Sequence, residues 1–206
     1  TILVLAHLSS RSFQSPPFMY KLLVGLLLCG FLGKGLAQPD LSSLIETWTD
    51  VSLPTEKRFE ALNELHAEFY LNNPDTVLHF LEELRILAEQ LDHQTALYSA
   101  YNRRGNILRM QGLDTEALKA YNDAEVVACS IGDSLRLATV FANRGNVHVQ
   151  LTNYVEATHH FSEALEIHRQ HGHVKGQRNM HMALGNVFTL IDHFDLAKAQ
   201  YALVLK

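Results

Sequence analysis

The sequence predicts an all-α protein built from antiparallel pairs of helices that stack one pair after another. A segment that begins with Gly-Asn returns at Gly105, Gly145 and Gly185, with a constant spacing of 40 residues. Self-similarity at a period between about 20 and 50 residues is typical of stacked repeat proteins. Within each segment, apolar residues recur at helical spacing and are interrupted once by a turn-forming residue such as Gly112. These observations indicate two amphipathic helices in each repeat.

The first 37 residues are expected to lie outside this fold. Residues 1–18 are expected to be upstream, unstructured sequence. Residues 19–37 have the three parts of a secretory signal peptide, which are a short basic start, an apolar run at 22–32 and a small-x-small site before Gln38. We therefore expect an exported chain, on the periplasmic or secreted side, that begins at Gln38.

Two other roles for this segment stay open. An uncleaved membrane anchor would use the same apolar run, although a spanning helix needs about 20 residues. A lipid-modified cysteine is less well supported, because Leu28 stands before Cys29 where a small residue is expected.

Removal of residues 1–37 would make the chain more acidic. The whole sequence has 17 basic and 22 acidic residues and a net charge of −5. The removed segment holds three basic residues and no acidic ones, so the remainder has 14 basic and 22 acidic residues and a net charge of −8. An acidic surface argues against a nucleic-acid partner and against direct binding to anionic membranes. The remaining cysteine, Cys129, has no disulfide partner and is expected to be a small core residue.

Residues 38–57 are expected to form a cap on the first repeat. A short helix should follow Asp40, and Trp48 is expected to cover the open end of the array, because solenoid ends need capping. The first repeat, 58–97, is a weaker match than the later ones. In that repeat Leu65 takes the glycine position, and Pro74 opens the second helix at a position that tolerates proline.

Three clearer repeats follow at 98–137, 138–177 and 178–206, and the last is incomplete. A glycine inside a helix costs about 1 kcal/mol, so its recurrence needs a packing reason. We expect each repeat glycine to face an alanine of the second helix, with an aromatic residue filling the space beside the crossing. The alanines are Ala117, Ala157 and Ala197, and the aromatic residues are Tyr121, Phe161 and Tyr201.

These positions resemble those of the tetratricopeptide repeat. The resemblance rests on glycine at the eighth position, alanine at the twentieth, an aromatic residue at the twenty-fourth and alanine at the twenty-seventh, where Val204 departs from the pattern. The common repeat has about 34 residues, and here the extra length is expected at 130–138 and 170–179, with Gly132 and Gly172 at helix ends. The resemblance covers 58–206 and implies a right-handed solenoid whose concave groove holds a protein or peptide partner.

The resemblance also implies that the residue after each repeat glycine faces this groove. An asparagine amide can donate and accept hydrogen bonds at once, so it suits the backbone of an extended peptide. The same amide could instead bond to the adjacent helix and fix the superhelix, and both roles stay open. The expected groove residues are Asn102, Asn106, Arg109, Ala142, Asn146, Asn179, Met182 and Asn186.

Arg104 and Arg144 stand where the family usually has leucine, and Leu184 keeps that residue in the third repeat. We expect each arginine to form an ion pair within its own repeat, with Asp123 or Glu163. An anion site in the groove is the alternative.

No catalytic or cofactor motif is present in the sequence. Eight of the 12 histidines lie between His148 and His193. A metal site around His168 and His171 is one interpretation, but metal binding needs a closed set of ligands at a known spacing, and none is evident. We therefore expect a histidine-rich polar surface, no cofactor, no metal and no enzyme activity in these residues.

Two functions follow as expectations. The first is an exported, non-catalytic scaffold that binds a protein or peptide. The second is the periplasmic input domain of a truncated membrane signalling protein, because "LSSLIETWTD … NNPDTVLHFLEELRILAEQ" resembles the start of bacterial adenylate or guanylate cyclases and sensor histidine kinases. A membrane span and a class III cyclase or histidine kinase domain would then follow Lys206.

The chain is also expected to be a fragment, because the last hairpin leaves an apolar face from Phe188, Ala199 and Leu203 without a cover. Terminal repeats need a polar outer face, so this end is expected to fray, to self-associate or to bind its missing continuation.

Overall fold

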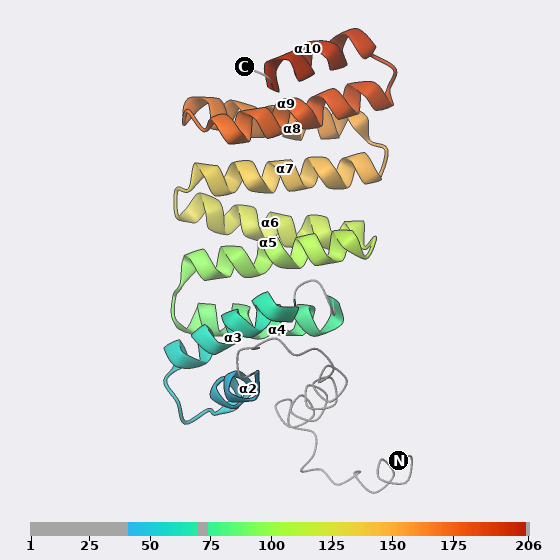
Figure 1. Ribbon diagram of the computed structural model, residues 1–206. Coiled ribbons are helices and arrows are strands. Elements are labelled where there is room, and N and C mark those ends of the chain that lie inside the picture. The colour runs from blue at the N-terminus through green and yellow to red at the C-terminus, as the bar shows by residue number, and fades with distance from the viewer. Residues whose placement is uncertain (1–40, 70–73, 205–206) are drawn as a thin grey trace, which may run out of the picture. The chain divides into compact units, whose positions relative to one another are not determined.

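The computed structural model describes residues 41–69 and 74–204, whose secondary structure is entirely helical (Figure 1). The chain divides into two compact units, Thr1–Glu68 and Phe69–Lys206. The upstream segment and the signal peptide expected at 1–37 lie outside the described residues. Among the helices of the described ranges, none is both long and apolar enough to cross a membrane.

The first unit contains helix α2, Leu41–Thr49, and helix α3, Thr55–Phe69. Trp48 is buried near the end of α2, with 4% of its surface exposed. Its backbone carbonyl accepts a hydrogen bond of 3.0 Å from Nε of Arg58, which links the start of α3 to the end of α2. The helix expected within 38–57 is therefore present, and the first helix of the repeat expected at 58–97 belongs to this unit.

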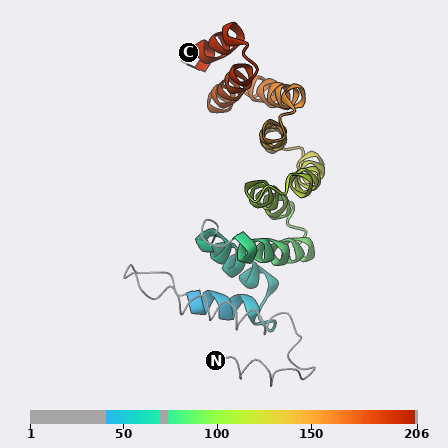
Figure 2. The ribbon, with the colours of Figure 1, turned by 90° about the vertical axis from the view of Figure 1, so that its right-hand side faces the viewer.

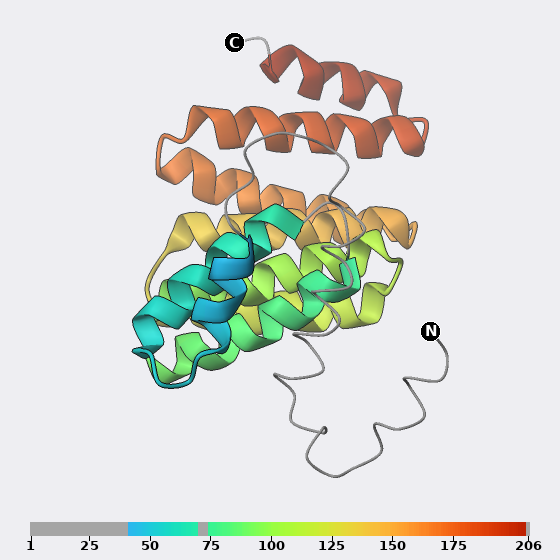
Figure 3. The ribbon, with the colours of Figure 1, turned by 60° about the horizontal axis from the view of Figure 1, so that its bottom comes forward.

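The second unit is a stack of helices in which each helix contacts the next one in sequence (Figures 1, 2 and 3). Pro74 is the first residue of its opening helix, as the sequence predicts. We call α5, α7 and α9 the first helices, and α6, α8 and α10 the second helices, of three hairpins. The bounds are α4 Pro74–Gln90, α5 Gln94–Met110, α6 Asp114–Ser130, α7 Ser134–Gln150, α8 Tyr154–Gln170, α9 Val174–Leu190 and α10 Phe194–Val204.

The 40-residue period has a simple origin in these bounds. Each complete hairpin has two helices of 17 residues, and three residues follow each helix. The helices begin four residues earlier than the predicted repeats, at Gln94 rather than at 98 and at Ser134 rather than at 138. The repeat glycine predicts where the two helices of a hairpin cross, but not where the first helix begins. The four residues at 94–97 and 134–137 form an additional helical turn that the repeat pattern does not mark.

A left-handed backbone residue closes each turn of the second unit, at a spacing of 20 residues. Gly112, Gly132 and Gly172 have φ of +75°, +67° and +62°. This confirms the glycine turns, since glycine adopts positive φ without steric cost. Asp133 then caps α7, because its carboxylate accepts a hydrogen bond of 3.0 Å from the backbone N–H of Arg136. The other turns use Asp92, Thr152 and Asp192.

The repeat glycines make close packing possible, and the atoms nearest to them belong to the aromatic rings rather than to the predicted alanines. A Cβ atom on Gly145 would lie 2.5 Å from an atom of the Phe161 ring, and one on Gly185 would lie 2.5 Å from the Tyr201 ring. Gly105 faces the ring of Tyr121 in the same way. Helical side chains lean toward the N-terminus of their helix, so the aromatic residue four positions after the alanine can supply the atoms nearest to the glycine.

Burial of these rings differs along the stack. Tyr121 and Phe161 are buried, with 0% and 1% of their surface exposed, and Tyr201 is 37% exposed. Of the face expected to lack a cover, Leu203 is 39% exposed, Ala199 is exposed, and Phe188 is half-buried against a core cluster formed by residues of α7, α8 and α9. The last described hairpin is therefore the least covered of the three.

Cys129 corrects another expectation, because its side chain is exposed. It lies in the last turn of α6 beside Ala128, which is fully buried. Ala128 therefore packs in the core, whereas the side chain of the next residue, Cys129, points to solvent.

Candidate functional site

The eight predicted groove residues all lie on the first helices. Helix α5 carries Asn102, Asn106 and Arg109, helix α7 carries Ala142 and Asn146, and helix α9 carries Asn179, Met182 and Asn186. Their spacing of three and four residues places those of each helix on one face. We call these surfaces together the first-helix face.

On α5, polar groups of this face are bonded to α7. Asn102 Oδ1 accepts a hydrogen bond of 2.8 Å from Nδ2 of Asn143. Arg109 Nη1 donates a bond of 2.7 Å to Oε1 of Gln150. The sequence reasoning missed Asn143 and Gln150, although both pairs are separated by 41 residues, one more than the repeat period. These side chains hold successive first helices together.

Tyr98 adds a third link between α5 and α7. Its hydroxyl donates a hydrogen bond of 3.1 Å to the backbone carbonyl of Arg136, and the guanidinium of Arg136 lies 4.8 Å from the centre of the Tyr98 ring. Burial raises the pKa of Tyr98 to about 12. The hydroxyl is therefore protonated at neutral pH and acts as a donor.

The three asparagines that follow the repeat glycines differ in their bonding. The hydroxyls of Tyr121 and Tyr201 donate hydrogen bonds of 2.8 Å to Oδ1 of Asn106 and Asn186. The structural role for these two amides is thus present, although their NH₂ groups are not used by those bonds. Asn146 has the same place in its hairpin as those two, but the aromatic residue there is Phe161, which has no hydroxyl.

The part of the face on α7 and α9 is consequently more open than the part on α5. Asn146, Asn179, Met182 and Asn186 are exposed, whereas Asn102, Asn106 and Arg109 are half-buried. Within the part of the chain that the structure describes, no hydrogen bond is recorded for the side chains of Asn146 and Asn179. These two amides can therefore bond to a partner without breaking a bond inside the protein.

The two arginines before the repeat glycines do form polar contacts, but not with the predicted residues. Arg104 Nη1 lies 3.3 Å from Oε2 of Glu82 on α4. Arg144 bonds to Glu125 and Asn122 on α6. The partners expected, Asp123 and Glu163, belong to the same hairpins as the arginines, whereas the observed partners belong to the preceding helix. The ion pairs therefore join neighbouring hairpins.

The alternative anion site finds little support at Arg104. This residue lines a cleft of about 390 Å³ with Glu82, Arg85, Lys119 and further residues of α5 and α6. Three basic and three acidic side chains line the cleft, so their formal charges cancel. Glu82 also accepts a bond of 2.7 Å from Arg85, which further neutralises the site.

At the junction of α8 and α9 the ionic contact is replaced by an apolar one. Leu184 takes the place of the arginine, and Leu165 stands 40 residues after Glu125. Leu184 is buried, with 4% of its surface exposed, and both leucines pack in one core cluster. Both members of the pair therefore differ between the two junctions, since Arg144 and Glu125 are replaced by Leu184 and Leu165.

The histidines form two local groups instead of one metal centre. His160 stacks between Phe141 and His148, with ring centres 6.0 Å and 5.3 Å away, and its Nδ1 lies 3.1 Å from Glu163. Burial lowers the pKa of His160. No three histidine, cysteine or carboxylate side chains of the described residues are placed to hold a metal ion.

The second group lies at the turn between α8 and α9. His168 is 7% exposed, and its Nδ1 lies 3.1 Å from Nδ1 of His173, close enough for one ring to donate to the other. A Cβ atom on Gly176 would lie 2.4 Å from the His168 ring, so this glycine makes room for it. Burial lowers the pKa of His168, with smaller contributions from His173 and His171.

Comparison with known proteins supports the same repeat architecture. The tetratricopeptide repeat family model matches residues 96–170. No curated protein matches the sequence. The structure resembles part of a signal transduction ATPase with numerous domains from Pyrococcus horikoshii, which has a tetratricopeptide repeat sensor, with a TM-score of 0.66, 17% identity and coverage of 76% of this chain. This chain spans only 24% of the length of that ATPase.

Two further structures share the fold. BtubC from P. vanneervenii has a TM-score of 0.67 and 15% identity, with 79% of this chain and 68% of BtubC covered. MamA has a TM-score of 0.60 and 14% identity, with 80% of this chain and 84% of MamA covered. At these identities the likeness establishes the fold alone.

Matched sequence, hairpin geometry and structural likeness agree. Repeats of this kind serve as non-catalytic scaffolds for protein–protein interaction. Residues 96–170 match the tetratricopeptide repeat family, and the described helices have the fold of a tetratricopeptide repeat solenoid.

Proposed function

We propose that the chain is an exported scaffold that holds an extended peptide segment of a partner protein along α7 and α9 of the first-helix face. The observation that carries the proposal is the exposed side chain of Asn146, which lacks the tyrosine hydroxyl that bonds to Asn106 and Asn186. An exposed amide without an internal partner can donate to and accept from a peptide backbone.

The surroundings of Asn146 suit such a ligand. Asn179 and Asn186 are exposed on α9 and provide further amide groups. Met182 is 48% exposed between them in sequence, and its flexible thioether can adapt to varied apolar side chains. Together these residues offer backbone recognition and one adaptable apolar contact.

The binding proposal can be tested with peptides selected by the full chain from a random library displayed on phage. Asn146→Ala should weaken the best selected peptide about three- to tenfold in fluorescence anisotropy, because it removes about 0.5–1.5 kcal/mol of hydrogen bonding. Ser162→Ala is the control, since Ser162 is exposed on the second helix α8. Equal loss in both variants, or no selected peptide, would contradict the proposal.

Export is a separate part of the proposal and rests on the sequence of residues 19–37. Expression in a bacterium, followed by fractionation and N-terminal sequencing, should find a chain that begins at Gln38 in the periplasm. An intact chain from Met19 in the membrane fraction would show an anchor instead.

The sensor part of a larger signalling protein is a second candidate. The observation that favours it is the similarity to a signal transduction ATPase whose described sensor consists of tetratricopeptide repeats. Sequencing of the gene downstream of the codon for Lys206 tests it, because a membrane span followed by a cyclase or kinase domain is expected. A stop codon directly after this segment would exclude it.

A further inference from the structure

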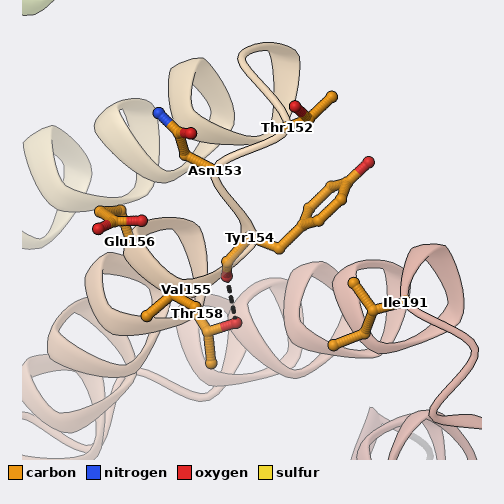
Figure 4. A pocket seen from close by; sticks show the side chains of 7 residues that line it. All are labelled: Thr152, Asn153, Tyr154, Val155, Glu156, Thr158 and Ile191. Atoms are coloured by element: carbon orange, nitrogen blue, oxygen red, sulfur yellow. Dashed lines mark hydrogen bonds between the residues drawn. The ribbon is translucent and has the colours of Figure 1, made fainter.

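A pocket lies at the turn between α7 and α8, and none of its lining residues belongs to the first-helix face. Its lining consists of residues 152–156, Thr158 and Ile191, and its volume is about 580 Å³ (Figure 4). We call it the turn pocket. The first six residues belong to the turn and the start of α8, and Ile191 follows the last residue of α9.

Apolar groups form much of the turn pocket. Val155 is 79% exposed, and Ile191 and Tyr154 are half-buried. The hydroxyl of Thr158 donates a hydrogen bond of 2.8 Å to the carbonyl of Tyr154, so this polar group is already satisfied (Figure 4). An exposed valine beside other apolar groups gains free energy when a partner removes it from water.

The preceding hairpin lacks this arrangement. Forty residues earlier, Asp114 and Thr115 stand in the places of Tyr154 and Val155. The preceding hairpin therefore lacks the apolar side chains of these two positions. This difference also supplies matched control positions for an experiment.

Polar groups at the edge of the turn pocket are available to a ligand. Asn153 precedes α8 as its N-cap residue, but its side chain makes no capping hydrogen bond. Within the described residues no hydrogen bond is recorded for the Tyr154 hydroxyl. Thr152 also has a φ of +58°, which is rare for a β-branched residue, and such strain often accompanies functional sites.

The charges around the turn pocket have one sign. Glu156 lines the pocket, and Asp192 and Asp195 line a second cleft formed by residues 192–196, which follow Ile191 directly in the sequence. Among the residues that line the two clefts there is no lysine or arginine, and His193 is the only basic residue. A positively charged ligand would be attracted to such a surface.

We propose that the turn pocket binds a short peptide segment in which an apolar side chain is flanked by lysine or arginine. The apolar side chain packs on Val155, Ile191 and the ring of Tyr154. The flanking cations face Glu156 and the carboxylates of 192–196. This site is additional to the peptide site on the first-helix face and does not depend on it.

The test uses the full chain and three fluorescein-labelled peptides, GKKLFKKG, GEELFEEG and GKKSSKKG, in anisotropy titrations. GKKLFKKG should bind at least about tenfold more tightly than either of the others. Its affinity should fall as salt is raised, because exposed charges are screened. Tighter binding of GEELFEEG, or equal binding of GKKSSKKG, would overturn the proposal.

Variants then locate the site. Val155→Ser should weaken GKKLFKKG about tenfold, and Glu156→Gln about threefold. Thr115→Ser and Glu116→Gln, at the equivalent places of the preceding hairpin, should have no effect. Asn146→Ala should also have none, so the turn pocket and the first-helix face can fail independently. Val155 and Glu156 are exposed, so these variants should fold.

A second copy of the chain is the competing occupant. Light scattering over a range of concentrations should give the same molar mass for the wild type and for Val155→Ser. A dimer that forms in the wild type and is lost in Val155→Ser would overturn the peptide proposal in favour of self-association.

Discussion

The polar side chains of the first-helix face on α5 are bonded within the protein, whereas those on α7 and α9 are exposed. Between α5 and α7, Asn102 and Arg109 are bonded to Asn143 and Gln150. On α7 and α9, Asn146 and Asn179 are exposed and make no recorded bond among the described residues. One repeat pattern can therefore have two uses, because the same face stabilises the stack on α5 and leaves exposed amide groups on α7 and α9.

The junctions between hairpins differ in the same direction. Helices α6 and α7 are joined by Arg144 with Glu125, whereas α8 and α9 are joined by Leu184 and Leu165. A partly buried ion pair and an apolar pair of similar volume often give similar stability. Leu184 and Leu165 pack α9 against α8, and the exposed amides Asn179 and Asn186 of α9 take no part in this contact.

Placing the arginine of one junction into the other should have the largest effect. Leu184→Arg would bury a charge without an acidic partner, because Leu165 stands in the place of Glu125. The second partner of Arg144, Asn122, is likewise replaced, by Ser162. We expect a loss of about 3 kcal/mol in the free energy of unfolding, measured by urea unfolding followed by circular dichroism. Leu184→Met, which keeps the volume, should cost less than about 1.5 kcal/mol. Similar midpoints for both variants would show that the apolar junction is not required.

The reverse exchange should have a smaller effect. Arg144→Leu alone leaves Glu125, which is about one-third exposed, without its cation, and we expect a loss of about 1–2 kcal/mol. Adding Glu125→Leu should restore the urea midpoint to within about 1 kcal/mol of the wild type, because it copies the Leu184–Leu165 junction. A double variant that is less stable than Arg144→Leu would contradict the equivalence of the two junctions.

Exchanging the left-handed residues of two equivalent turns should change the free energy of unfolding by about 1 kcal/mol. Thr152 holds a left-handed conformation that Gly112 adopts at the equivalent turn of the preceding hairpin. Thr152→Gly should therefore raise the free energy of unfolding by about 1 kcal/mol, since the left-handed region costs a residue with a Cβ atom roughly 1–2 kcal/mol. Gly112→Thr should lower it. Destabilisation by Thr152→Gly in a thermal melt would mean that the threonine side chain stabilises this turn.

The pH dependence should be modest and should have a definite sign. The pKa values of His160 and His168, both on α8, are lowered mainly by burial. The unfolded chain therefore binds more protons than the folded one below the ordinary pKa of about 6.5. Stability should be complete above that pH and should fall as the pH decreases through 6.5 toward the lowered values.

Urea midpoints at pH 7.5 and pH 5.5 would measure this fall. Groups near the two rings contribute as well, namely His148, Glu163 and Arg144 for His160, and His171 and His173 for His168. His160→Phe should flatten the dependence, because it keeps an aromatic ring beside Phe141 and removes the titrating group. An increase in stability toward pH 5.5 would contradict the assignment.

Much of the fold could be predicted because the period encodes it locally. The repeat glycines, the turn residues at 112, 132 and 172, and Pro74 each mark one feature of a helix or turn. The ring over Gly145 was predicted less well, because the direction of a side chain matters as much as its position. The ring of Phe161 supplies the atoms nearest to Gly145.

The candidate site could be predicted only in part. The first-helix face followed from helical spacing, but which of its amides stay free depends on contacts between hairpins. The bonds of Asn102 and Arg109 join residues 41 apart, and Arg104 bonds to Glu82, 22 residues before it. Such offsets follow from how one hairpin packs on the next, which the sequence of a single repeat does not contain.

Hydrogen exchange of the full chain can show whether α7 and α9 form the part of the first-helix face that binds a peptide. Exchange would be followed by mass spectrometry with and without a peptide selected from the random library. We expect slower exchange on binding in residues 134–150 and 174–190, with 94–110 unchanged. Slower exchange in 94–110 alone, or no change in α7 and α9, would contradict the claim.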